Sequence, residues 1–425
     1  MIKFIKTYFI PFIALFIFFF DEIFSCAAIV GGFVVDNGMK KYEAIILSFI
    51  GYSIFFFNIV SGKISQKEQR IWSVLILILL LYSLTPIFYD GKSEYYQTYL
   101  LVFGSESIPA AYVGMKLAKS GSVSRIIDIL PFFVIPISLL IGTIGVTAAM
   151  IGETVNQNSG YGVEEGLNYQ NLSYYMAFSY TYALFYVLYG GPKKGLGNLA
   201  LKVIMGADAV FCAVVCLTGG GRGAFVYIVF ISAFILLYFF KSSAINRSHA
   251  VLFIALLAVV LFFLINSFGV MESAGMERIL GNLTEDNARM ELYRSAFSAF
   301  LSSPAIGMGV GSIWWTVGYY SHNIVLDLLA ETGLVGTLFF TFVIWTTIKR
   351  LYRYSKWEKC FLFLLLVMSG ALVNCMFSGY WIAAIKVYFV CSFVYCMPKF
   401  AFSNRIRNAF VQNSNELKKQ FYIRK

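Results

Sequence analysis

Long apolar runs alternate with short polar segments along most of the chain, and many runs reach about 20 residues, which is enough to cross a bilayer as a helix. The pattern therefore predicts an all-α polytopic membrane protein with about 12 transmembrane helices. Ser105, Glu106 and Pro109 interrupt the fourth run, which indicates a broken or tilted helix there. The expected spans are 4–20, 44–60, 71–88, 98–115, 126–151, 172–189, 199–217, 224–240, 250–265, 323–345, 360–376 and 381–397.

The composition supports a membrane protein and excludes an ordinary soluble domain. Hydrophobic residues make up 59% of the chain and charged residues only 13%, whereas soluble domains are roughly 45–50% apolar and about 25% charged. The 7 cysteines lie in apolar runs without the spacing of metal ligands, so we interpret them as packed free thiols. No metal site and no cofactor are expected.

Lysine and arginine gather in alternate loops, which predicts the orientation of the chain. Both termini are expected in the cytoplasm, and the net charge of +11 follows largely from inward loops and a basic tail that meet anionic lipid. A nucleic-acid partner is not needed to explain this charge. The expected organisation is an N-terminal helical region 1–198, a central region 199–345 with a large outward loop 266–322, C-terminal helices 346–398 and the tail 399–425.

The large outward loop has its own polar and apolar pattern. Thr284 can cap a helix whose apolar positions recur at helical spacing until Pro304, so an amphipathic helix is expected there. Three glycines then predict a turn in which the backbone approaches a neighbour closely: Gly307, Gly309 and Gly311.

A second helix is expected to begin after His322. Asn323, Asp327 and Glu331 follow at intervals of four and so share one face of that helix. Gly333 and Gly336 would allow this helix to pack tightly against a neighbour.

The predicted topology brings Arg222, Arg289 and His322 to the outer membrane face. Guanidinium groups bind phosphate oxygens, and an imidazole can accept a proton from an attacking hydroxyl. Together they point to chemistry on a pyrophosphate, whose departing charge the arginines would neutralise. The competing interpretations are arginines that reach lipid head groups and a histidine in a solvated position.

These elements resemble the O-antigen ligase and O-antigen polymerase superfamily of bacterial envelope enzymes. The resemblance covers about residues 199–345. It rests on Gly221-Arg222-Gly-Ala, on Arg289 with its following aromatic, and on the order of Pro304, Gly307, Gly309, His322-Asn323, Glu331 and Gly333.

The resemblance implies a metal-independent glycosyltransferase at the periplasmic face of the bacterial inner membrane. Its donor would be a glycan on undecaprenyl pyrophosphate. Arg222 and Arg289 would bind the pyrophosphate, and His322 would act on the acceptor or the leaving group. Asn323 and Glu331 would complete the substrate-binding set in a supporting role.

Three functions stay open at this point. The segment after His322 favours a polymerase that joins lipid-linked repeat units of O-antigen or a related polysaccharide. A ligase that transfers the glycan to lipid A–core is the alternative. A protein that controls chain length is a further candidate partner of this chain. A flippase for lipid-linked sugars is the third, because three charges could lie within the membrane: Asp128, Asp208 and Lys386.

Overall fold

The computed structural model describes residues 2–20, 22–23, 64–90, 93–150, 169–190, 196–242 and 287–397, with scattered positions between 45 and 56. The expected span 250–265, the cap at Thr284 and the tail 399–425 lie outside these residues. All regular elements in the described part are helical. The all-α prediction therefore agrees with the structure.

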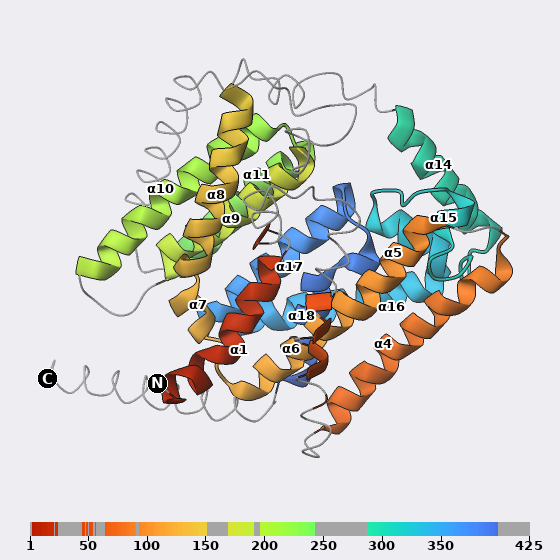
Figure 1. Ribbon diagram of the computed structural model, residues 1–425, viewed down its shortest axis with the longest axis horizontal. Helices are drawn as coiled ribbons and strands as arrows, with labels where there is room; N and C mark the ends of the chain where they lie inside the picture. Colours follow the sequence, from red (N-terminus) through yellow and green to blue (C-terminus); the bar gives the residue numbers. More distant parts are fainter. Residues whose placement is uncertain are drawn as a thin grey trace, which may run out of the picture.

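The helices keep the labels of Figure 1. Five in the described part are long and apolar enough to cross a membrane, namely those over 66–88, 197–219, 222–241, 324–355 and 359–377. The expected count of about 12 stays a prediction. The elements are α1 (Ile2–Phe18), α4 (Gln66–Leu84), α5 (Glu94–Val102), α6 (Ile108–Ser120), α7 (Arg125–Ile129), α8 (Pro131–Met150), α9 (Tyr169–Tyr189), α10 (Leu196–Gly219), α11 (Arg222–Ser242), α14 (Asn287–Ser302), α15 (Ile313–Thr316), α16 (Ile324–Ser355), α17 (Lys359–Phe377) and α18 (Ile385–Cys396).

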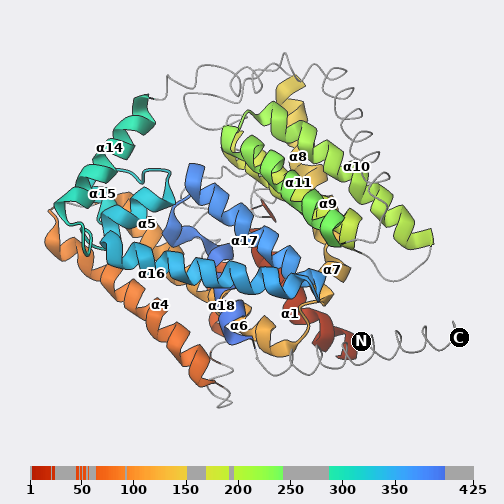
Figure 2. The same ribbon diagram turned by 180° about the vertical axis from the view of Figure 1, so that it is seen from behind.

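Two groups of helices flank a buried centre (Figures 1 and 2). Helices α8 to α11 pack together on one side, while α4 and α14 to α16 lie on the other, with α17 and α18 between them. Helix α6 is buried along most of its length against α18, and Gly114 provides the space that the α18 backbone needs at Phe389. Large apolar side chains on α4, α11 and α16 face outward, as expected for contact with lipid.

Lysines gather at one end of the bundle, which we call the lysine end. The buried carboxylate of Glu68 pairs with Lys116 at 2.9 Å and also with Lys119. Lys67 donates to the carbonyl of Met397, and the Lys359 ammonium lies over two tyrosine rings where α9 and α11 end. The charge pattern of the sequence assigns all of these lysines to the same membrane face.

The opposite end is rich in tyrosine, and we call it the tyrosine end. Helices α9, α11 and α16 begin there, and α4, α10 and α17 end there. The Thr85 hydroxyl donates to the carbonyl of Val310 at 2.6 Å, and the Tyr89 hydroxyl donates to that of Met308 at 2.8 Å. The end of α4 thereby holds the segment that connects α14 to α16.

The interruption expected in the fourth apolar run appears as a π-helical segment, Phe103–Ser107, between α5 and α6. Such single-turn π segments frequently occur at functional sites. The Ser107 hydroxyl anchors this one by donating to the carbonyl of Ile382 at 2.8 Å. Glu106 is only 5% exposed and lies in this segment, at the junction of α5 and α6.

Helix α16 is not the continuous helix that its sequence suggests. Gly333 has φ 60° and ψ −163°, which breaks the helical path. The backbone amides of Leu334 and Val335 donate instead to the carbonyls of Pro304 and Ala305 at 2.9 and 3.1 Å. In return, the amides of Met308 and Gly309 donate to the carbonyls of Ala330 and Glu331, both at 2.9 Å. The break therefore joins α16 to the glycine-rich turn.

Gly333→Ala is expected to destabilise the protein by about 2–5 kcal/mol, because its backbone angles are accessible essentially to glycine alone and the added methyl would meet packed backbone. A Cβ atom here would lie 2.5 Å from the carbonyl of Ala305 and from the amide nitrogen of Gly307. The measurement is the free energy of unfolding in detergent. Gly318→Ala is the matched control, since φ at Gly318 is +86° but nothing lies within 4 Å of its Cβ position. Equal losses in the two variants would contradict the proposed role of this contact.

Candidate functional site

The glycine-rich turn after α14 shows why these positions carry glycine. Gly307, Gly309 and Gly311 have φ values of +73°, +106° and +83°. A side chain at Gly307 would meet the Glu331 backbone, and one at Gly311 would meet the ring of Tyr82. The prediction of a turn with close backbone approach agrees with this geometry. The turn leads directly to His322.

His322 lies in a strained and aromatic setting. Its φ of 58° makes it the one non-glycine residue with positive φ in the described part of the chain. The imidazole is half-buried, and its ring centroid lies 4.4 Å from that of Tyr320 and 5.5 Å from that of Tyr319. Backbone outliers of this kind cluster at functional sites, where the surrounding structure has to hold them. The Ser321 amide, which donates to the Asp327 carboxylate at 2.8 Å, provides part of that support.

Arg222 begins α11 at the tyrosine end and is half-buried. The preceding Gly221 donates its amide to the Ser173 hydroxyl at 3.0 Å. The following Gly223 lies directly against the hydroxyl of Tyr174 and the side chain of Phe377. Glycines on both sides thus allow α11 to start in close contact with α9 and α17.

Arg289 lies in the first turn of α14 and is half-buried. Its charge acts through space on Tyr174, the same tyrosine that contacts Gly223. Arg294, one and a half turns further along the helix, is exposed. The structure therefore brings the start of α11, which begins with Arg222, and the charge of Arg289 toward one tyrosine although 67 positions separate the two arginines in the sequence.

Asn323 and Glu331 have structural partners of their own. The Asn323 side chain caps α16 by accepting from the amides of Val325 and Leu326. Glu331 is fully buried and accepts from the Tyr380 hydroxyl at 2.5 Å and from the Trp381 indole at 2.8 Å. Both side chains thereby position the segments around the site, and their expected substrate contact stays a prediction.

The tyrosines of this region keep their protons. Burial, and then the charge of Glu331, raises the pKa of Tyr380 well above its usual value, so its hydroxyl donates to that carboxylate. Burial likewise raises the pKa of Tyr320, whose hydroxyl donates to the Ser378 carbonyl at 2.8 Å. These bonds connect the segment of His322 to the segment that follows α17.

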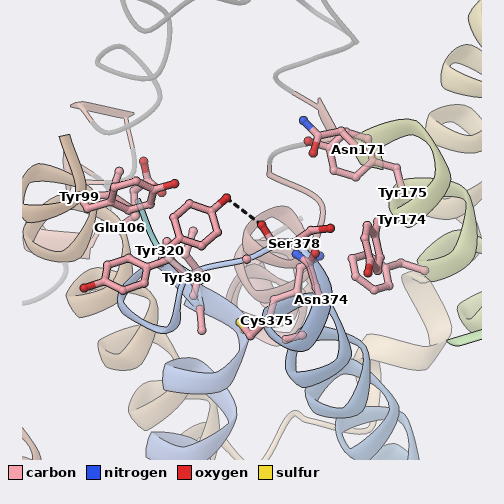
Figure 3. Close-up of a pocket in the computed structure, with 18 of the residues that line it drawn as sticks. Tyr99, Glu106, Asn171, Tyr174, Tyr175, Tyr320, Asn374, Cys375, Ser378 and Tyr380 are labelled. Atoms are coloured by element: carbon pink, nitrogen blue, oxygen red, sulfur yellow. Dashed lines mark hydrogen bonds between the residues drawn. The ribbon is translucent and has the colours of Figure 1, made fainter. Parts of the chain in front are cut away.

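A cavity of about 260 Å³ opens between α9, the C-terminal end of α17 and the π-helical segment (Figure 3). Its aromatic lining is five tyrosines and Phe178, and Figure 3 shows Tyr99, Tyr320 and Tyr380 facing Tyr174 and Tyr175. Its other polar lining includes Glu106, Asn171, Asn374, Ser378 and Lys386.

The predicted residues Arg222, Arg289 and His322 are not part of this lining, but lining residues connect to their segments. Tyr174, on one wall, is the residue that Gly223 contacts and on which Arg289 acts. Tyr320, on the opposite wall, contacts His322. His322 thus contacts a lining residue and Arg289 acts on another, while Arg222 precedes the glycine that packs against Tyr174.

Sequence reasoning did not assign the cavity residues to the site. Two of them left a signal, because Glu106 and Lys386 are ionisable residues inside apolar runs, and such residues often mark function. The tyrosines left none, since they resemble the many other aromatic residues of the chain. Within the described ranges, no three His, Cys, Asp or Glu side chains gather in a way that could hold a metal ion.

The three charged residues on which the flippase alternative rested all have partners in the structure. Asp128 pairs with Arg125 at 3.1 Å, where both side chains are exposed. Asp208 is buried and accepts from the Ser138 hydroxyl at 2.5 Å. Lys386 pairs with Glu22 at 3.3 Å. These contacts give each charge a structural role within the bundle.

Comparison with known proteins places the predicted site in a recognised domain. Residues 208–341 match the family model described as O-antigen ligase, and this stretch contains Arg222, Arg289, His322, Asn323 and Glu331. A curated relative is the ComP-specific O-oligosaccharyltransferase of Acinetobacter baylyi, which is 25% identical over 239 residues. The alignment covers 50% of this chain and 40% of the relative, and no solved structure matches. The chain is thus similar to the O-antigen ligase family over residues 208–341, the stretch that holds all five predicted site residues.

Proposed function

We propose that this protein is a membrane glycosyltransferase that moves a glycan from a lipid diphosphate carrier to an acceptor hydroxyl. The proposal is supported by one cavity whose lining tyrosines, Tyr174 and Tyr320, are affected by Arg289 and contacted by His322 respectively, with Arg222 beside the glycine that packs on Tyr174. The family match and the oligosaccharyltransferase relative support the same reaction type. The site is assigned to the periplasmic face of the bacterial inner membrane, with undecaprenyl as the lipid of the carrier.

In the proposed reaction, the oxygen of the acceptor hydroxyl attacks the anomeric carbon of the donor sugar. The bond from that carbon to the diphosphate oxygen breaks, and its electron pair stays on the leaving diphosphate. Arg222 and Arg289 neutralise the charge that develops there. His322 accepts the proton of the attacking hydroxyl, and its aromatic neighbours hold the imidazole in place.

Two acceptors satisfy this geometry. A polymerase would use a second lipid-linked repeat unit, as the sequence after His322 favours. A ligase would use a different acceptor such as lipid A–core, and this alternative gains support from the descriptions of the family and of the relative. A flippase is the weakest of the three, because the buried charges have structural partners.

Reconstitution in vesicles tests the proposal. The purified protein is supplied with the lipid-diphosphate glycan of its own cells, first alone and then with lipid A–core, and the products are separated by mass. Longer glycans on the lipid in the first arm identify a polymerase, and products that need lipid A–core identify a ligase. Movement of the glycan across the bilayer without a new glycosidic bond would refute the proposed transfer.

A further inference from the structure

We propose that the cavity beside Arg222, Arg289 and His322 binds one sugar unit of a glycan substrate, and that Glu106 accepts hydrogen bonds from its hydroxyls. The proposal rests on glycosyl transfer as the function of this site. It adds a binding pocket and a residue in the N-terminal half of the chain, where sequence motifs indicated nothing.

The lining of the cavity suits a sugar better than a diphosphate or a lipid tail. A sugar ring offers hydroxyls to polar groups and a C–H face to aromatic rings, and tyrosines, amides and a carboxylate provide both kinds of contact. A diphosphate would be repelled by Glu106, while Lys386, the nearest compensating cation in the lining, already pairs with Glu22. A lipid tail would remove water from the carboxylate, amides and ammonium of the lining without offering them a hydrogen bond, which costs free energy.

The size of the cavity indicates one sugar unit. Its volume of about 260 Å³ lies just below the usual range of roughly 300–1,000 Å³ for pockets that hold drug-sized ligands. A single ring therefore fits better than a longer chain. The rest of the glycan would extend outward from the tyrosine end.

The location of the cavity connects it to the proposed chemistry. Tyr174 lines it and is affected by the charge of Arg289, and Tyr320 lines it and contacts His322. A diphosphate held by the arginines would carry its first sugar toward this space. An acceptor that presents its hydroxyl to His322 would reach the same space from the opposite wall.

Glu106 is built into this wall as a fixed group. It belongs to the π-helical segment, and the neighbouring Ser107 holds that segment to the carbonyl of Ile382. Glu331 holds the same stretch through Tyr380 and Trp381. The carboxylate of Glu106 is thus fixed in the lining of the cavity, where it would meet the hydroxyls of a sugar bound there.

The pocket also lies largely outside the conserved domain model. The family match spans 208–341, whereas Glu106, Asn171, Tyr380 and Lys386 lie before or after it. The chemistry would thus come from the shared domain and the choice of sugar from the surrounding chain. Asn171 ends the segment 152–171, which carries three glutamates and no lysine or arginine.

Binding of the free oligosaccharide tests the pocket independently of turnover. The probe is the glycan released by mild acid from the lipid carriers of the native cells, titrated against the full-length protein in detergent. We expect Glu106→Gln, which keeps the size of the side chain, to weaken binding roughly 10- to 100-fold, the range for losing a hydrogen bond to a charged group. Ala371→Phe should abolish binding, because Ala371 lines the cavity.

Val335→Phe is the control, since Val335 is 64% exposed on α16, away from the cavity lining. It should bind as the wild type does. The pocket would be overturned if the wild type failed to bind, or if Glu106→Gln and Ala371→Phe both bound with the affinity of the wild type. If binding behaves as expected but the wild type transfers no glycan, the proposed reaction fails and the pocket stands.

The same variants in the transfer assay show whether the sugar in the pocket belongs to the donor or to the acceptor. A raised KM for the lipid-diphosphate glycan places the donor sugar in the pocket, and a raised KM for the acceptor places the acceptor there. In either case kcat should change less than KM, because Glu106 binds a sugar and takes no proton in the reaction. A loss in kcat alone, with both KM values unchanged, would refute this role.

Discussion

His322→Asn is expected to reduce kcat for glycan transfer by roughly 10²–10⁴-fold, the usual contribution of a general base. Asparagine is the informative replacement because the backbone at His322 has φ 58°, a conformation that asparagine tolerates and alanine does not. The variant therefore removes the imidazole while it keeps the local fold. Initial rates in vesicles, measured with saturating donor and acceptor, provide kcat.

The dependence on pH separates catalysis from packing. The wild type should show a rate that rises as the imidazole loses its proton, and this limb should disappear in His322→Asn. Asn323→Ala is the control for a purely structural effect, because Asn323 caps the same helix. It should lower stability by about 1 kcal/mol and leave the pH profile in place. Turnover of His322→Asn within fivefold of the wild type would rule out His322 as the base.

Arg289→Ala is expected to reduce kcat by roughly 10²–10³-fold, because one preorganised donor to the leaving diphosphate is lost. The side chain is half-buried in the first turn of α14, and its charge reaches Tyr174 at the wall of the cavity. Arg222→Ala should lose a similar factor, because Arg222 is the second proposed donor to the same diphosphate. The measurement is the initial rate of product formation.

Arg294→Ala is the matched control for Arg289→Ala. It removes the same charge from the same helix, but the Arg294 side chain is exposed. Transfer by Arg294→Ala should stay within about twofold of the wild type, as is usual for surface substitutions. Equal losses in Arg289→Ala and Arg294→Ala would mean that α14 acts through its net charge, and this would contradict a specific diphosphate site.

The local features of the fold were predictable where a single stretch of chain decides them. The apolar runs predicted α4, α10, α11 and α17 with small shifts at their ends. The polar interruption around Glu106 appears as a π-helical segment. The three glycines after α14 adopt the positive φ angles that a tight turn requires.

The break in α16 was not predictable from its own residues. Gly333 and Gly336 within an apolar helix indicated tight packing, and glycine in a membrane helix is common. What makes the break favourable is an exchange of backbone hydrogen bonds with residues 304–309, a segment more than 20 positions away. Periodicity within one helix carries no information about such a partner.

The predicted site shows the same division. The residue types of Arg222, Arg289 and His322 indicated diphosphate chemistry because charged and imidazole groups are rare and costly in this chain. Glu331 was expected to bind substrate, whereas the structure gives its carboxylate two buried donors, Tyr380 and Trp381. Those donors come from the segment after α17, and no spacing in the sequence connects them to Glu331.

The sequence by itself determined the class of the protein, the approximate membrane helices and the side chains that carry the proposed chemistry. These follow from the transfer of apolar and charged groups between water and lipid, which depends on each stretch of chain alone. Only the tertiary structure decided that α16 breaks at Gly333, that Glu331 is a buried anchor, and that Glu106, Tyr174 and Tyr320 enclose one cavity. Those features depend on contacts between distant segments, which only the packing of the bundle brings together.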